Sequence, residues 1–256
     1  MMNSITHLKG STITATDGQI GHVMEAYFDD QTWTVRYLVV DTGSWLSGRS
    51  VLVSPYSVKQ PLDNAKNIDV SLSRHQVEHC PNIDTHQPVS RRHERDYLNY
   101  YAYPEYWGGA DLWGMGPYPL VPEALPTAVE TQVQSALREQ DVPAEDVHLR
   151  SSAAVTGYDI QATDDSIGHV EDFVFDDETW AIRYLVVDTR NWWPGGKKVL
   201  VATRWIDRID WADKTVYTKL TREQIKNSPE FDEVATLNRD FEQRLHEAVG
   251  REGYWG

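Results

Sequence analysis

Residues 15–42 read ATDGQIGHVMEAYFDDQTWTVRYLVVDT, and residues 162–189 read ATDDSIGHVEDFVFDDETWAIRYLVVDT. Aligned from Gly10 and Gly157 at a spacing of 147, the two copies are identical at 23 of 41 positions. Self-similarity at this level indicates a duplicated gene segment, and it sets the number of hydrophobic cores before any local pattern is considered. We therefore expect two copies of one small domain.

The repeat extends well beyond this stretch. One inserted residue after Gly195 changes the spacing to 148, and Glu94 then aligns with Glu242. The tripeptide YWG at residues 106–108 likewise recurs at residues 254–256. The sequence thus predicts a first unit over residues 1–108 and a second unit over residues 148–256. Residues 109–147 form a linker that is rich in Gly and Pro and has apolar spacing for one helix.

Each unit begins with short β signals. Residues 20–28 and 32–41 are rich in β-branched and aromatic residues, and the polar pair Asp29-Asp30 between them suits a turn. The run YLVVD is typical of a buried strand. Capping boxes at Ser73 and Thr221 predict short helices after the strands. We also expect a helix near Ser90, and an equivalent one that starts at Ser228.

These motifs resemble the PRC-barrel family, named for the barrel of the photosynthetic reaction centre H subunit and shared with the ribosome maturation factor. The shared pattern is D-G-x-I-G-x-V, a hairpin through D-D-x-T-W, then R-Y-L-V-V-D-T and a later V-L-V; the second copy lacks the glycine after Asp164. The longer pattern is similar to free-standing tandem bacterial members. The resemblance implies a mainly β chain of two small PRC-type barrels, each followed by short helices and an aromatic C-terminal arm.

For function, the resemblance implies a non-enzymatic scaffold or adaptor that binds a protein partner or self-associates. Two alternatives follow from the named relatives: a peripheral accessory protein of photosynthetic or electron-transfer membranes, and a ribosome assembly factor. We expect the two barrels to be related by an approximate twofold axis, with an isologous interface like that of a homodimer.

Composition narrows these classes. The formal net charge of -15 disfavours binding to phosphate backbones or anionic lipid headgroups, so we expect no nucleic-acid partner. No apolar run reaches the length of about 20 residues that spans a bilayer, and we expect no stable membrane insertion. The single cysteine, Cys80, fits a reducing compartment. We predict a cytoplasmic protein.

Several groups could bind a metal or carry protons. The acidic pairs at Asp29 and Asp176 fit either polar turns or oxygen ligands for a hard cation. His75, His79 and Cys80 have the spacing of zinc ligands on one helix face, although the second copy lacks them. His22 and His169 fit either packed strand residues or the proton carriers implied by the reaction-centre relative. No nucleotide-binding or nucleophile motif is present, and we predict no catalytic residue, no metal and no cofactor.

Aromatic residues outside the expected strands are the clearest candidates for binding. The chain has 10 Trp and 13 Tyr, and exposed rings of these types are enriched at protein interfaces. They could instead be buried between the barrels or under the arms. The predicted partner-binding residues are Trp45, Trp192, Trp193, Tyr106, Trp107, Tyr254 and Trp255.

Overall fold

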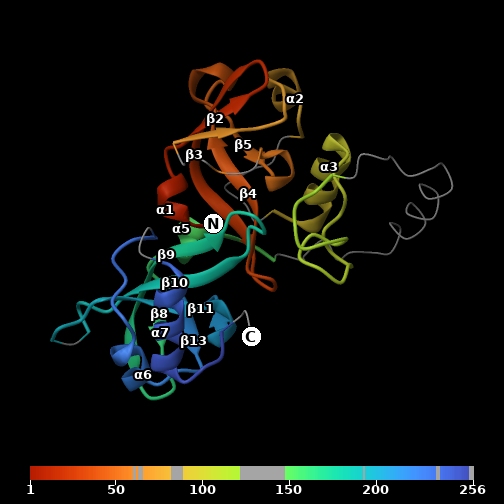
Figure 1. Cartoon of the computed structure of the whole chain (residues 1–256). Coiled ribbons are helices and arrows are strands. Elements are labelled where there is room, and N and C mark those ends of the chain that lie inside the picture. The colour runs from red at the N-terminus through yellow and green to blue at the C-terminus, as the bar shows by residue number, and fades with distance from the viewer. Residues whose placement is uncertain are drawn as a thin grey trace.

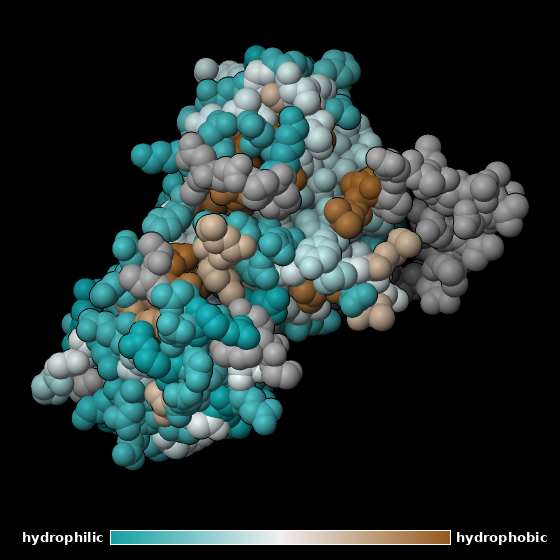
Figure 2. Space-filling model, viewed as in Figure 1, coloured by the Kyte–Doolittle hydropathy of each residue, from teal (hydrophilic) through white to brown (hydrophobic). Residues whose placement is uncertain are grey.

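The computed structural model describes residues 1–59, 62, 66–81, 89–121, 148–192, 194–234 and 237–253. Figure 1 shows two lobes, one built on β2 to β5 and the other on β8 to β13, which meet where β4, β9 and β10 lie together. Figure 2 shows a mainly hydrophilic face on which apolar side chains gather in separate small patches. The chain is mainly β, as the motif pattern predicts.

The first lobe contains a six-stranded sheet. Its order is β5-β4-β3-β2-β6, and β7 also pairs with β3. Neighbouring strands are antiparallel, except that β2 and β6 run parallel. The strands are β2 (Thr12–Ala15), β3 (Gly18–Asp29), β4 (Thr34–Asp41), β5 (Ser50–Val53), β6 (Asn67–Asp69) and β7 (Leu149–Ser151).

The second lobe repeats this arrangement with seven strands. Its order is β11-β10-β9-β8-β13-β12, and β1 also pairs with β9. The parallel pair is now β8 with β13. The strands are β1 (Met2–Ser4), β8 (Asp159–Gln161), β9 (Ser166–Asp176), β10 (Ile182–Asp188), β11 (Lys198–Ala202), β12 (Ile206–Asp210) and β13 (Thr215–Thr218).

The two lobes exchange their first strands. Met2 of β1 lies opposite Asp176 in the second lobe, and Leu149 of β7 lies opposite Asp29 in the first. Helix α1 (Ile5–Leu8) then carries the chain from the second sheet to the first, and α5 (Ser152–Val155) carries it from the first sheet to the second. The sheets therefore do not follow the segments 1–108 and 148–256, because each sheet contains one strand from the other repeat.

An approximate twofold axis passes between β4 and β10. Thr34 and Ala181 form an antiparallel bridge there. On either side of it, the Val35 amide donates to the Trp180 carbonyl over 2.8 Å, and the Ile182 amide donates to the Trp33 carbonyl over 2.6 Å. These contacts join equivalent positions of the two repeats, so the interface is isologous, as expected for a duplicated homodimer.

Gly21 and Gly168 explain the glycine of the I-G-H motif. A Cβ atom at Gly21 would lie 2.0 Å from the Asp41 carbonyl oxygen, and one at Gly168 would lie 2.3 Å from that of Asp188. No side chain fits such a close approach of two backbones. The glycine is therefore a requirement of strand pairing.

The helices follow their caps. Capping boxes start α2 (Arg74–Glu78) and α6 (Arg222–Asn227), as predicted. Ser90 caps α3 (Arg91–Tyr101), and Asn238 caps the equivalent α7 (Arg239–Val249). The helix start predicted at Ser228 is wrong: residues 229–233 are irregular, because the Phe231 amide donates to the Lys198 carbonyl at the edge of β11. The described residues also contain the short 3-10 turns η1 (Gly43–Leu46), η2 (Pro55–Ser57) and η3 (Thr203–Trp205).

Two further predictions concern a helix in the linker and the absence of membrane insertion. The helix expected within the linker lies outside the described residues. Within the described ranges, no helix is long and apolar enough to cross a membrane.

Candidate functional site: a buried polar cluster and the aromatic strap

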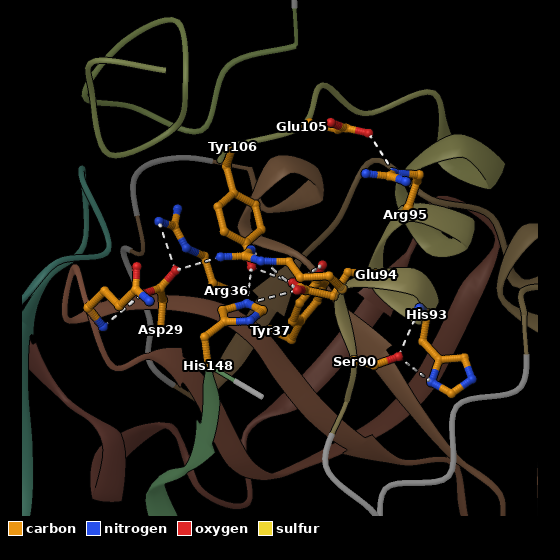
Figure 3. Close-up of polar contacts among 12 residues, drawn as sticks. Asp29, Arg36, Tyr37, Ser90, His93, Glu94, Arg95, Glu105, Tyr106 and His148 are labelled. Carbon is orange, nitrogen blue, oxygen red and sulfur yellow. Dashed lines mark hydrogen bonds and ion pairs between the residues drawn. The ribbon is translucent and has the colours of Figure 1, made fainter. Parts of the chain in front are cut away.

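A buried carboxylate, Glu94, is the centre of the first lobe's polar contacts (Figure 3). The Tyr37 hydroxyl of β4 donates to Glu94 over 3.1 Å, and the Tyr106 hydroxyl donates to the same oxygen. His148 Nε2 lies 2.8 Å from the second oxygen, and Arg91 lies 3.4 Å from it. A buried carboxylate is tolerated only with such partners, so these contacts hold α3 against the sheet.

The cluster is closed to solvent. Glu94 is 0% exposed, Tyr37 and His148 are each 1% exposed, and Tyr106 is 4% exposed. Burial, followed by the charge of Glu94, raises the pKa of Tyr37 and of Tyr106 well above the ordinary value, so both phenols stay protonated as donors. These buried groups satisfy one another inside the first lobe, and their contacts fix the position of α3 on the sheet.

His148 joins the two repeats at this point. It directly precedes β7, the strand that the second repeat contributes to the first sheet. Its backbone carbonyl accepts from the Asp30 amide over 3.0 Å, and its ring lies 3.1 Å from the Tyr106 hydroxyl. The strand exchange therefore completes the polar cluster of the first lobe.

Residues 103–121, which follow α3, form what we call the aromatic strap. Arg36 lies beneath it, with its guanidinium carbon 3.8 Å from the centroid of the Tyr106 ring and 4.7 Å from that of Trp113. Arg36 also donates to the Leu112 carbonyl over 2.6 Å. Stacked and hydrogen-bonded in this way, a buried guanidinium keeps its charge. The strap is thus bound to β4 through one arginine.

Trp113 extends the strap to the second lobe. Its indole nitrogen donates to the Thr179 carbonyl over 2.8 Å, in the turn between β9 and β10. Its ring also packs edge-on against Tyr56 with centroids 4.9 Å apart. Since Trp113 is only 2% exposed, it acts as a wedge between the two lobes.

The second lobe repeats the centre of the cluster. The Tyr184 hydroxyl donates to Glu242 over 2.8 Å and lies 3.4 Å from His246 Nε2. His246 also packs against Trp205, with ring centroids 4.9 Å apart. The sequence signal for this cluster is the recurrence of Tyr37 as Tyr184 and of Glu94 as Glu242 in the second repeat.

The predicted partner-binding residues have different surroundings. Tyr106 is buried in the cluster, so the structure removes it from the partner-binding set. Trp107 is partly exposed, with Arg91 over its ring at 4.6 Å. Trp45, in η1, and Trp192 are partly exposed, and Arg74 lies 4.3 Å from the Trp45 ring centroid. Trp193, Tyr254 and Trp255 lie outside the described residues.

The acidic pairs are built into turns. Asp29 Oδ1 accepts from the amides of Gln31 and Thr32 at 2.9 and 3.1 Å, and Asp176 Oδ1 accepts from the amide of Glu178 at 3.0 Å. Carboxylate contacts of this kind stabilise the turn itself. The structure favours the turn reading over a cation site.

The histidine and cysteine candidates are not gathered at one point. The His75 and His79 rings lie 4.4 Å apart between centroids and are tilted by 31°, whereas Cys80 is buried beside Arg49, and burial raises the pKa of its thiol. His22 is exposed and lies 3.2 Å from Gln19. Within the described ranges, no group of three or more His, Cys, Asp or Glu side chains could hold a metal ion.

Comparison with protein-family models matches one family, described as PRC-barrel domain, over residues 1–70 and again over residues 151–225. The two matched segments correspond to the two copies of the repeat. No curated protein sequence matches the chain.

Proposed function

We propose, from the premise that this chain belongs to the PRC-barrel domain family, that it is a non-enzymatic scaffold or adaptor which binds a protein partner or a second copy of itself. The family suggests a scaffold or binding role. The closed polar cluster supports this proposal, because its most reactive groups are held in internal hydrogen bonds.

One observation carries the proposal: the two repeats present equivalent aromatic loops at opposite ends of the molecule. The loops that hold Trp45 and Trp192 follow β4 and β10, and these strands start together at the bridge between Thr34 and Ala181. Because the bridge is antiparallel, the strands run away from each other. Eight residues of β4 at about 3.3 Å each place the first loop up to about 25 Å from the axis.

Such an arrangement suits a bivalent adaptor. A partly exposed tryptophan offers a large, rigid contact area, and tryptophan is common among the residues that dominate binding energy. Two equivalent sites on one chain can hold two copies of a partner, or two sites of one partner, with a gain in avidity. The separation between the two tryptophan loops would let a scaffold hold two binding partners apart.

The experiment compares capture of partners from the native cell by the parent chain, Trp45→Ala, Trp192→Ala and the double variant. We expect each single variant to capture less and the double variant to lose capture, while circular dichroism stays unchanged. Met24→Ala, at an exposed strand position, is the control. Equal capture by all variants, with no concentration-dependent self-association in light scattering, would contradict the proposal.

A further inference from the structure

Two equivalent hairpin turns of this chain differ in what covers them. Residues 29–33 join β3 to β4 and residues 176–180 join β9 to β10, and both follow the pattern D-D-x-T-W. The backbones agree, since Trp33 has φ 53° and Trp180 has φ 59°. The rings agree as well: Trp33 stacks on Phe28 at 5.4 Å, and Trp180 stacks on Phe175 at 5.3 Å.

Their exposure differs sharply. Thr179 is 8% exposed and Trp180 is 0% exposed, whereas Thr32 is exposed and Trp33 is partly exposed. The cause is the aromatic strap, whose Trp113 donates its indole hydrogen to the Thr179 carbonyl. The second turn thus has a tryptophan bound to it, supplied from within the chain.

The tryptophan is presented by a tight glycine-containing turn. The Trp113 amide donates to the Gly116 carbonyl over 2.9 Å, and the Gly114 amide donates to the Asp111 carbonyl over 3.1 Å. Gly114 has φ 77°, which favours glycine, and a Cβ at Gly109 would lie 2.1 Å from the Gly114 carbonyl oxygen. The bound element is therefore a compact loop of residues 109–116 with one anchoring ring.

We propose that the first turn, residues 29–33, is a docking site for a peptide of the same chemistry carried by a partner protein: a tryptophan in a glycine-rich turn with a carboxylate nearby. This inference rests on the proposed scaffold function and names the partner's recognition element. The anchoring indole would donate to the Thr32 carbonyl, as Trp113 does to Thr179. Among the described residues, that carbonyl accepts from the Thr34 hydroxyl over 3.3 Å, which leaves its second lone pair for the indole.

One wall of the site sets the charge of its ligand. At the second turn, Trp113 packs against Tyr56. The residue equivalent to Tyr56 in the second repeat is Arg204, which is exposed. By the twofold symmetry, Arg204 would lie beside a ligand bound at the first turn. Arg204 lies 3.3 Å from His246 Nδ1 and still presents its charge to solvent. A cation beside an aromatic anchor favours a ligand that carries an acidic residue, and the strap itself has Asp111 two positions before its tryptophan.

The test uses a fluorescent synthetic peptide with the sequence of residues 109–116, GADLWGMG, titrated with the full chain and followed by anisotropy. We expect saturable binding of one peptide per chain, lost when the peptide tryptophan is replaced by alanine. Arg204→Glu should weaken binding about tenfold. Arg208→Glu, the same charge change at an exposed position on β12, should leave it unchanged. Amide exchange should slow at residues 29–34.

Several outcomes would overturn the proposal. The first is a titration in which peptide binding does not saturate. The second is equal binding of the peptide by Arg204→Glu and by the parent chain. The third is slowed amide exchange at residues 176–181, which would mean that the peptide displaces the strap. Concentration-dependent dimers that disappear in Trp33→Ala would instead identify a second copy of this chain as the occupant. Failure of the peptide with intact capture through Trp45 and Trp192 would remove this docking site and leave the scaffold function standing.

Discussion

Thr34 pairs with Ala181 across the approximate twofold axis, and each of these residues occupies the other's position in the repeat. The separation of 147 residues equals the spacing of the duplicated stretch. An axis that passes through equivalent residues is the property of a symmetric dimer. The reciprocal exchange of β1 and β7 has the same symmetry, so the chain has the architecture of a strand-exchanged dimer whose two subunits are joined by a linker.

Removing Trp113 should weaken the junction between the lobes. Trp113→Ala deletes a buried ring and its hydrogen bond to Thr179, and we expect the free energy of unfolding to fall by about 3–5 kcal/mol. Trp113→Phe keeps a ring and loses only the donor, at about 1 kcal/mol. Guanidinium denaturation measures both. Met115→Ala, at an exposed position of the strap, is the control, and equal losses for all three would contradict the wedge role.

Glu94→Gln should destabilise the first lobe strongly. The carboxylate accepts from Tyr37 and Tyr106 and faces His148, and an amide nitrogen in its place would oppose a donor. We expect the free energy of unfolding, measured in urea, to fall by about 3 kcal/mol, because the buried Arg91 loses one of its carboxylate partners. Glu105→Gln, which breaks a partly exposed pair with Arg95, should cost under about 1 kcal/mol. A loss for Glu94→Gln no larger than this would refute the central role of the carboxylate.

His246 should make stability depend on pH. Burial, followed by the charge of Arg204, lowers the pKa of His246 below its ordinary value of 6.5. The unfolded chain then binds more protons, so the contribution is favourable at neutral pH and is lost as pH falls through 6.5 toward the lower folded-state value. His246→Leu, which copies Leu98 of the first repeat, should flatten this decline in urea titrations between about pH 7.5 and 5.5. An unchanged slope would contradict the assignment.

The ends of α3 and α7 offer a paired test of backbone strain. Both end in a left-handed residue, Ala102 with φ 55° and Gly250 with φ 64°. An alanine in this region is strained by about 1 kcal/mol, whereas glycine is not. In thermal unfolding, Ala102→Gly should therefore raise the Tm and Gly250→Ala should lower it. The same sign for both substitutions would show that the caps are not equivalent.

The sequence predicts the parts that local chemistry controls. The capping boxes at Ser73 and Thr221, the N-cap at Ser90 and the buried strand that contains Tyr37 all appear as expected, because each depends on neighbouring residues. The start predicted at Ser228 was wrong because Phe231 pairs with a strand far away in the sequence. Local capping signals cannot report such a contact.

The strand exchange could not be predicted from the sequence, for a different reason. In the described structure β1 pairs with residues 174–176, and the equivalent residues 27–29 carry closely similar chemistry. The hydrophobic pattern of β1 therefore fits either repeat, and only the path of the chain through α1 decides between them. The burial of Tyr106 likewise depends on the exchange, because His148, which contacts its hydroxyl, belongs to the other repeat.

The most direct test of the paired-barrel architecture is a disulfide that can form only across the exchange. In a Cys80→Ser background, Met2→Cys with Asp176→Cys places two thiols on directly opposite residues, at a spacing that suits a disulfide. We predict rapid crosslinking within monomeric chains for this pair, and no crosslinking for Met2→Cys with Asp29→Cys, the equivalent pair within one repeat. Efficient crosslinking of the second pair, with none of the first within a chain, would show that each barrel keeps its own strand.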